Sequence, residues 1–171
     1  MKKIIVCLLL LGIFNSTYSQ SLKKYSIGST GCSVHSYCEP KFGITYSEDS
    51  AKVYTSECGS DDIYYMVICI ELRKNITPVL KAEAALVNYV NQLKTQFKVL
   101  YSTGYSNGLK LKGKENTRGI SENWKDDEQF NWKVKGWTDG RFITVLLAYS
   151  KKDLPEKTVN PFLDGLLFKG M

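Results

Sequence analysis

The sequence predicts an α+β fold, a mostly antiparallel sheet of about six to seven strands with helices on both faces (an α/β/α sandwich). Three observations predict it. One amphipathic helix pattern separates two groups of strand patterns, a second helix pattern closes the chain, and two strand patterns are apolar on both faces. Such strands need a covering layer on each side, and helices segregated from antiparallel strands are typical of α+β domains.

Three strands are predicted before the long helix. In KFGITYS, the large residues Phe42, Ile44 and Tyr46 alternate with small or polar ones, which predicts a strand. AKVYTSEC (51–58) follows the turn-like SEDS, and DIYYMVICIEL (62–72) follows GSDD. The last of these is apolar on both faces, so we place it inside the sheet.

One helix of about twenty residues is predicted between Thr77 and Phe97. Thr77 offers a capping hydroxyl, and Pro78 suits the first turn. Apolar residues then recur at spacings of three and four, at Val79, Ala82, Leu86, Val90, Leu93 and Phe97. This stripe predicts one buried helix face against the sheet.

Strand patterns return after the helix. KVLYSTGY and GLKLKGKENT predict two strands, and 120–150 predicts three more, separated by the acidic turn KDDEQ and by TDG. The last of them, RFITVLLAYS, is apolar on both faces and is expected to be central. A short second helix is predicted at Asn160 and Pro161, with the asparagine as its cap.

Two short motifs carry a family resemblance. The first strand contains FGITY, and the chain closes with PFLDGLLF. With the order of elements, they resemble the PsbP-like and Mog1-like α/β/α sandwich superfamily, in which an F-x-I-x-Y strand opens the domain and an FL-x-S-F motif ends it. Here Gly165 and Leu166 stand where Ser and Phe are usual. The resemblance covers roughly residues 40–168.

The resemblance implies a fold and a broad class of role. Members of this superfamily serve as photosystem accessory subunits, as binding partners of a small GTPase, and as exported bacterial proteins of unassigned role. It therefore implies binding or assembly in general and no single task, because one fold hosts many functions. It assigns no metal-binding or partner-binding residue to this sequence.

The amino terminus predicts export. Lys2 and Lys3 precede an apolar run, and the small residues Thr17 and Ser19 follow it, which is typical of a secretory signal peptide over residues 1–19 with cleavage before Gln20. The apolar run is too short for a membrane span of about 20 residues, and no later segment predicts one. We expect a periplasmic or secreted protein, with a polar N-terminal arm over 20–37 and a single domain over 38–171.

The charge pattern argues against nucleic acid as a partner. The formal net charge is +6 for the whole chain, and about +4 once the two lysines of the predicted signal are removed. Residues 39–83 hold eight acidic against five basic residues, whereas 84–171 hold fourteen basic against nine acidic ones. A nucleic-acid-binding domain normally carries a denser basic patch.

Four cysteines remain after the predicted cleavage: Cys32, Cys38, Cys58 and Cys69. An even number in an oxidising compartment predicts two disulfides with three connectivities. If 41–47 and 51–58 form a hairpin, Cys38 lies nearly opposite Cys58, which favours Cys38–Cys58 with Cys32–Cys69. The alternative is Cys32–Cys38 with Cys58–Cys69.

The same region contains His35, the only histidine, within GCSVHSYC. Zinc ligation by Cys32, His35 and Cys38 is a weaker interpretation than a disulfide, because the spacing differs from C-x₂₋₄-C motifs and an oxidising compartment disfavours thiolates. A catalytic Cys-His pair needs a free thiolate, so we expect no catalytic role and no metal or other cofactor.

Two further motifs come close to known ligand-binding patterns. GLKLKGKE nearly matches a phosphate-binding loop, but Glu115 replaces the required hydroxyl and the alternation of Leu and Lys predicts a strand. The acidic pair Asp61-Asp62 and the acidic triplet Asp126-Asp127-Glu128 lack the spacing of a calcium loop. Both are interpreted as ordinary structure.

A basic stripe with aromatic neighbours is the candidate contact surface. Its residues alternate along two predicted strands and are Lys110, Lys112, Lys114, Lys133, Lys135 and Trp137, with Trp124 nearby. Such a stripe suits an acidic partner protein, an anionic glycan or a lipid surface. The alternative is a solvated face whose lysines keep a sheet edge from aggregating.

These observations predict an exported, non-catalytic accessory or interaction protein that binds a protein partner. One alternative is an immunity or inhibitor protein of the periplasm. The other is an enzyme acting on cell-envelope polymers, which needs convergent carboxylates such as Glu122, Asp126 and Asp139.

Overall fold

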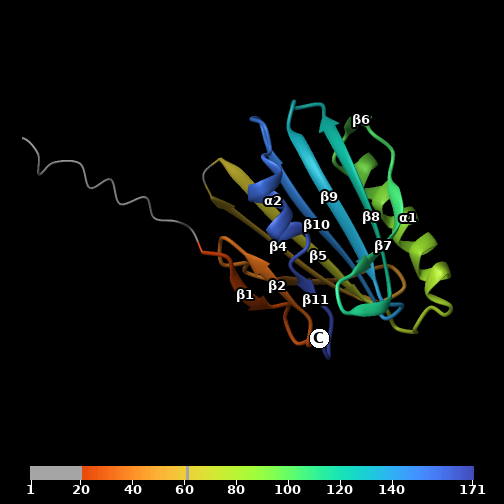
Figure 1. The fold of residues 1–171 in the computed structure, drawn as a ribbon. Helices are drawn as coiled ribbons and strands as arrows, with labels where there is room; N and C mark the ends of the chain where they lie inside the picture. Colours follow the sequence, from red (N-terminus) through yellow and green to blue (C-terminus); the bar gives the residue numbers. More distant parts are fainter. Residues whose placement is uncertain (1–20, 61) are drawn as a thin grey trace, which may run out of the picture.

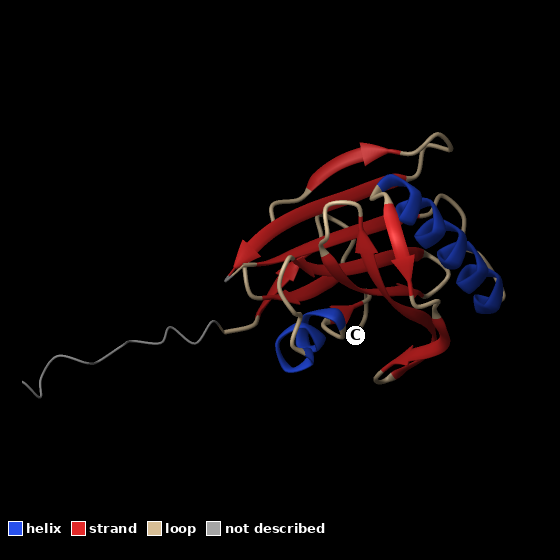
Figure 2. Cartoon of the chain, turned by 90° about the horizontal axis from the view of Figure 1, so that it is seen from above, coloured by secondary structure: helices blue, strands red, loops and turns tan. Residues whose placement is uncertain are grey.

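A computed structural model describes residues 21–60 and 62–171 of the chain. A large antiparallel sheet lies between two helices (Figure 1), which Figure 2 shows on opposite sides of the sheet. The predicted signal peptide lies outside the described residues and stays a prediction. In the described part of the chain, no helix is both long enough and apolar enough to cross a membrane.

The main sheet has eight strands, in the order β3-β4-β5-β10-β9-β8-β6, with β7 paired to β8 as well. All its pairings are antiparallel. Its strands are β3 (Gly43–Tyr46), β4 (Lys52–Ser60), β5 (Ile63–Glu71), β6 (Val99–Ser102), β7 (Ser106–Leu111), β8 (Lys114–Asp126), β9 (Asn131–Thr138) and β10 (Phe142–Ser150). The α+β class and the mostly antiparallel sheet are confirmed, and the sheet is larger than predicted.

The two central strands are largely buried on both faces, as their composition predicted. β10 pairs with β5 on one side and with β9 on the other. Val145 and Leu147 face one apolar cluster, whereas Leu146 and Ala148 face the other. The sheet therefore separates two cores, each closed by a different helix.

Helix α1 (Val79–Gln96) covers the first core. Its predicted stripe is confirmed, because the buried residues are Ala82, Leu86, Val90 and Leu93. The predicted Thr77 cap is wrong. The N-cap position is Pro78, with no side-chain capping bond, and the Lys81 N–H donates to the Pro78 carbonyl instead. Proline fixes the entry into the helix without a hydroxyl.

Helix α2 (Glu156–Leu163) covers the second core. It begins after Pro155, four residues earlier than the predicted start at Asn160, and Pro161 lies inside it. Phe162 and Leu163 are buried. The closing motif then needs Gly165, because a Cβ there would lie 2.9 Å from the Cβ of His35 and 2.8 Å from the Pro161 carbonyl oxygen.

The segment predicted as a polar arm over 20–37 contains two strands in its described part, residues 21–37. It contains β1 (Lys23–Ser26) and β2 (Ser33–Ser36), which form a three-stranded sheet with β11 (Leu166–Leu167) on the α2 side of the molecule. Figure 1 shows these strands beside one another, although β11 lies at the other end of the sequence. These strands were not predicted, because four-residue strands carry too few apolar residues to give a periodic signal.

Replacing Ile27 with valine tests whether this segment belongs to the core. Ile27 is fully buried, so the lost methylene should lower the free energy of unfolding by about 0.5–1.5 kcal/mol in urea. The same change at Ile44, which is 55% exposed, should have no measurable effect. Equal stability of the Ile27 variant and the wild type would mean that the segment is frayed.

A hairpin replaces the single strand predicted over 108–117. β7 ends at Leu111, the chain turns through Lys112 and Gly113, and β8 begins at Lys114. Gly113 has a φ of 78°, which suits a turn that few other residues adopt. The three lysines predicted on one strand therefore lie on a hairpin, with Lys110 on β7, Lys112 in the turn and Lys114 on β8.

Candidate functional site

The disulfide Cys38–Cys58 is present, with Cα atoms 5.9 Å apart. It joins the chain before β3 to β4, as the hairpin argument predicted. In that hairpin, β3 pairs with β4 so that Ile44 lies opposite Tyr54. The side-chain hydroxyl of Ser36, at the end of β2, lies 3.8 Å and 3.9 Å from the two sulfurs. The disulfide therefore fastens the end of β2 to the main sheet.

The second predicted disulfide, Cys32–Cys69, is not formed. Both residues are free thiols in the core of the α2 side. Cys69 lies on β5, where its sulfur accepts a hydrogen bond from the Thr144 hydroxyl on β10. Cys32 lies after a tight turn in which its carbonyl accepts from the Ile27 N–H. Each thiol is thus fixed by its own neighbours.

Burial raises the pKa of the Cys69 thiol from 9.0 to about 12. Between about pH 9 and pH 12 the unfolded chain has lost this proton and the folded chain keeps it. The free energy of unfolding should therefore fall as the pH rises through this window. Other groups titrate there too, so the measurement compares wild type with Cys69→Ala. We expect a steeper fall for wild type, and equal slopes would contradict a buried thiol.

His35 has a structural position on β2. Its backbone N–H donates to the Gly165 carbonyl at 3.0 Å, and its ring Nδ1 lies 3.2 Å from the same oxygen. The considered zinc set is not assembled, because Cys38 is in the disulfide. Across residues 21–60 and 62–171, no three histidine, cysteine, aspartate or glutamate side chains are grouped to hold a metal ion.

The predicted basic stripe is divided and largely neutralised. Lys114 lies 3.7 Å from Asp139, and Lys110 is paired with Glu115. On β9, Lys133 lies 3.4 Å from Glu156 and Lys135 lies 2.7 Å from Asp164, both beside α2. Within the described chain, Lys112 alone of the five predicted lysines has no ion pair. The stripe therefore presents little free positive charge.

Trp137 does not belong to a surface. It shares a face of β9 with Lys133 and Lys135, but it is 3% exposed and its Nε1–H donates to the Leu163 carbonyl. Strand alternation predicted the correct face of β9 for Trp137, but it did not predict that α2 covers that face. Trp124, 2% exposed, is buried on the α1 side.

The three carboxylates considered for an enzyme do not converge. Glu122 is buried and accepts hydrogen bonds from Lys94 at 2.8 Å, from the Trp124 indole at 2.7 Å, and from Ser102. Asp139 accepts from backbone N–H groups in the β9–β10 turn. Asp126 lies beyond the opposite end of β9. The three carboxylates therefore lie apart, and each accepts hydrogen bonds from within the protein.

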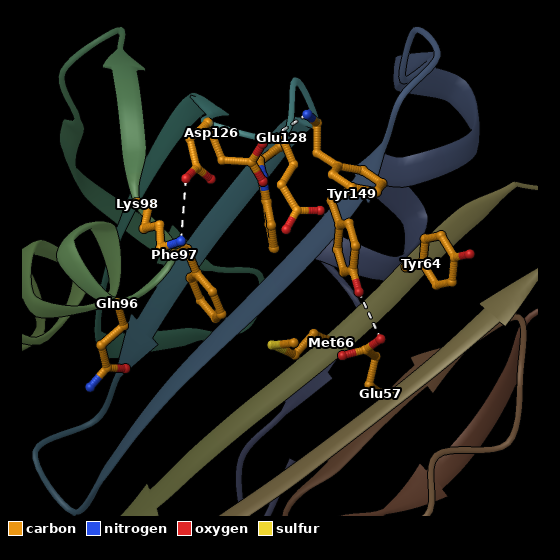
Figure 3. Close-up of a pocket in the computed structure, with 12 residues that line it drawn as sticks. Glu57, Tyr64, Met66, Gln96, Phe97, Lys98, Asp126, Glu128 and Tyr149 are labelled. Carbon is orange, nitrogen blue, oxygen red and sulfur yellow. Dashed lines mark hydrogen bonds and ion pairs between the residues drawn. The ribbon is translucent and has the colours of Figure 1, made fainter.

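A pocket of about 400 Å³ lies where α1 ends and the sheet continues beyond it. Figure 3 shows Phe97 and Lys98 on one side, Tyr64 on the other, and Met66 and Glu57 along one edge. The β8–β9 turn supplies acidic residues at the edge facing them. Five segments of the chain therefore meet around this pocket.

Four aromatic rings form a stacked row along the pocket. Tyr64, Tyr149 and Trp132 are cross-strand neighbours on β5, β10 and β9, and Phe97 comes from the end of α1. The centroids are 5.0 Å apart for Tyr64 and Tyr149, 4.1 Å for Tyr149 and Trp132, and 5.0 Å for Trp132 and Phe97. The two inner rings therefore have both faces covered.

Hydrogen bonds fix this row to the acidic residues. The Trp132 indole N–H donates to Asp126 at 2.8 Å, and the Tyr149 hydroxyl donates to Glu57 at 2.7 Å, as Figure 3 shows for the latter. Burial, and to a smaller extent the hydrogen bond to Glu57, raises the pKa of the Tyr149 phenol well above its ordinary value. The phenol therefore stays protonated and keeps donating across the physiological pH range.

The rim of the pocket is acidic. Asp126 ends β8, Asp127 and Glu128 lie on the β8–β9 turn, and Glu57 lies across the row of rings. Asp126 is buried and bound to Trp132 and to the Phe130 N–H. Asp127 has a surface ion pair with Lys98 at 3.4 Å. Sequence analysis singled out only the turn acids, because Glu57 and the aromatic residues come together by strand pairing.

The pocket combines an apolar wall with outward-facing carboxylates. This arrangement suits a ligand with an apolar body and a polar or cationic tip. Comparison of the sequence with protein-family models and with curated proteins gave no match.

Proposed function

We propose that this chain is an exported, non-catalytic interaction protein that binds a protein partner through the aromatic and acidic pocket beyond α1. The observation that carries the proposal is the pocket itself, in which a fixed row of aromatic rings is bordered by exposed carboxylates. Aromatic residues are enriched at protein interfaces, where their rings need little ordering on binding.

Preorganisation supports a binding role. Trp132 and Tyr149 are each held by stacking on both faces and by a hydrogen bond to a carboxylate. A partner that contacts this row does not have to order it, which lowers the cost of association. The disulfide Cys38–Cys58 supports export, because such bonds persist in oxidising compartments.

The fixed roles of the carboxylates support the non-catalytic part of the proposal. Asp126 binds an indole and a backbone amide, and Glu122 binds a lysine and an indole elsewhere. General acid or base catalysis needs a carboxyl free to exchange a proton with substrate. We retain the resemblance to PsbP-like and Mog1-like proteins as part of the proposal, supported by the antiparallel sheet with a helix on each face.

Site-specific photo-crosslinking in the native host tests this function. A benzoylphenylalanine at Glu128 on the pocket rim should crosslink to a discrete partner protein, whereas one at Glu48, exposed in the β3–β4 turn, should not. Mass spectrometry then identifies the adduct. Absence of an adduct at Glu128, or the same adducts from both positions, would overturn the pocket as the partner site.

A further inference from the structure

We propose that the pocket accepts the side chain of a lysine or arginine from a basic segment of the partner. This inference rests on the proposed function, since it names the chemistry that the partner presents. Lysine and arginine have an apolar stem and a cationic head, and the pocket offers a matching surface to each part.

The charge on the rim favours a cation. Four carboxylates line the pocket and one lysine accompanies them. Asp126 and Asp127 have partners within the chain. Glu128 has no hydrogen bond or ion pair within the described chain, and Glu57 is bound through one oxygen, by an uncharged phenol. Two carboxylates thus lack a cation, on a chain whose net charge is positive.

The wall of the pocket suits an aliphatic stem better than a sugar. Sugars bind to open faces of aromatic rings, but both faces of Trp132 and Tyr149 are covered by other rings. Tyr64, 41% exposed, leans over Gly59 on its other side, where an added Cβ would lie 3.2 Å from the ring. The rings therefore present their edges, together with Met66, as an apolar floor.

The chain's own lysines already occupy the margins of this surface. The Lys98 ammonium lies 3.4 Å from Asp127, and that of Lys151 lies 4.9 Å from the centroid of the Phe130 ring. Both cations reach the pocket margin from turns beside it. A partner's cation at Glu57 and Glu128 would compete with neither the Lys98–Asp127 ion pair nor the Lys151–Phe130 cation–π contact.

Calorimetric titration with matched peptides tests the ligand class. The probe is an acetylated, amidated peptide that alternates serine with three lysines, and its control carries Nε-acetyllysine, which keeps the stem and removes the charge. The lysine peptide should bind saturably and more weakly as salt is raised, since exposed ion pairs are screened. The acetyllysine peptide should bind at least about tenfold more weakly.

Two double variants locate the binding. Glu57→Gln with Glu128→Gln should weaken binding of the lysine peptide about tenfold, as expected for two partly exposed ion pairs. Glu48→Gln with Glu115→Gln removes the same charge far from the pocket and should leave affinity unchanged. Equal losses in both double variants would show a general charge effect and overturn the proposal.

Replacing Lys98 gives a change of opposite sign. Lys98 has a φ of 50°, a conformation that asparagine tolerates well, so Lys98→Asn should fold normally. It frees Asp127 and removes a repelling cation, and the lysine peptide should therefore bind a few-fold more tightly. Unchanged or weaker binding would contradict a cation site at this rim.

The peptide titration tests this inference and the crosslinking tests the proposed function, so either can be contradicted without the other. If Glu128 crosslinks to a partner but the lysine peptide does not bind, the pocket is a contact site for another chemistry and this inference is wrong. If the lysine peptide binds but no partner crosslinks, the proposed function is wrong. Binding of the acetyllysine peptide as tightly as the lysine peptide also overturns the inference.

Discussion

Replacing Trp132 with alanine is expected to lower the free energy of unfolding by about 3–5 kcal/mol. Trp132 is 5% exposed and lies between Tyr149 and Phe97 in the aromatic row. Its removal leaves a cavity between the sheet and the end of α1. It also removes one of two hydrogen bonds to the buried Asp126 carboxylate. Urea unfolding followed by circular dichroism measures the loss.

Trp132→Phe retains part of the packing and removes the hydrogen bond. Phenylalanine keeps a smaller aromatic ring in the row and loses the indole N–H, so the cost should exceed the roughly 1–3 kcal/mol of leaving a buried polar group without its partner and stay below that of the alanine variant. A loss below about 1 kcal/mol for the alanine variant would mean that the row is not formed in solution.

Removing the disulfide is expected to lower the free energy of unfolding by about 3 kcal/mol. The bond closes a loop with a sequence separation of 20 residues, and the chain-entropy model gives about this value for such a loop. The double variant Cys38→Ala with Cys58→Ala avoids leaving a single reactive thiol. Urea unfolding of this variant and of the oxidised wild type gives the difference.

A control and a mapping experiment accompany this prediction. Reducing agent should destabilise the wild type to the level of the double variant and should leave the double variant unchanged. Peptide mapping without reduction should recover Cys38 joined to Cys58, with Cys32 and Cys69 as thiols. Recovery of Cys32 joined to Cys38 would show that the alternative connectivity is the real one.

Local patterns predicted the elements whose signals are local. The stripe containing Leu86, Val90 and Leu93 identifies α1 because helix periodicity depends only on neighbours in the sequence. The Cys38–Cys58 bond was predicted because a hairpin fixes which residues face each other across a turn. The central positions of β5 and β10 followed from strands that are apolar on both faces.

The features that the sequence did not predict depend on packing between residues far apart in the chain. Strand β11 has two residues and pairs with β2 across most of the chain, so no periodicity signals it. Trp137 was assigned to the correct face of β9, but its burial depends on where α2 crosses that face. The position of a helix over a sheet is a tertiary feature that strand alternation does not encode.

The pocket is the strongest case of such non-local assembly. Glu57, Phe97, Trp132 and Tyr149 come from four different elements. Their meeting depends on the register between β5 and β10, which pairs Tyr64 with Tyr149, and on the point where α1 ends. One signal was present in the sequence, the shared face of Phe130 and Trp132, but nothing local related it to Glu57.

The indole signals of the three tryptophans test the central claim most directly. Each indole N–H has its own acceptor: Glu122 for Trp124, Asp126 for Trp132, and the Leu163 carbonyl for Trp137. In a ¹H–¹⁵N spectrum titrated with the lysine peptide, the Trp132 signal should move progressively to saturation, and that of Trp137, on the other face of the sheet, should stay in place. A shift of Trp137 with Trp132 unmoved, or no shift of Trp132 at all, would contradict a cation-binding pocket beyond α1.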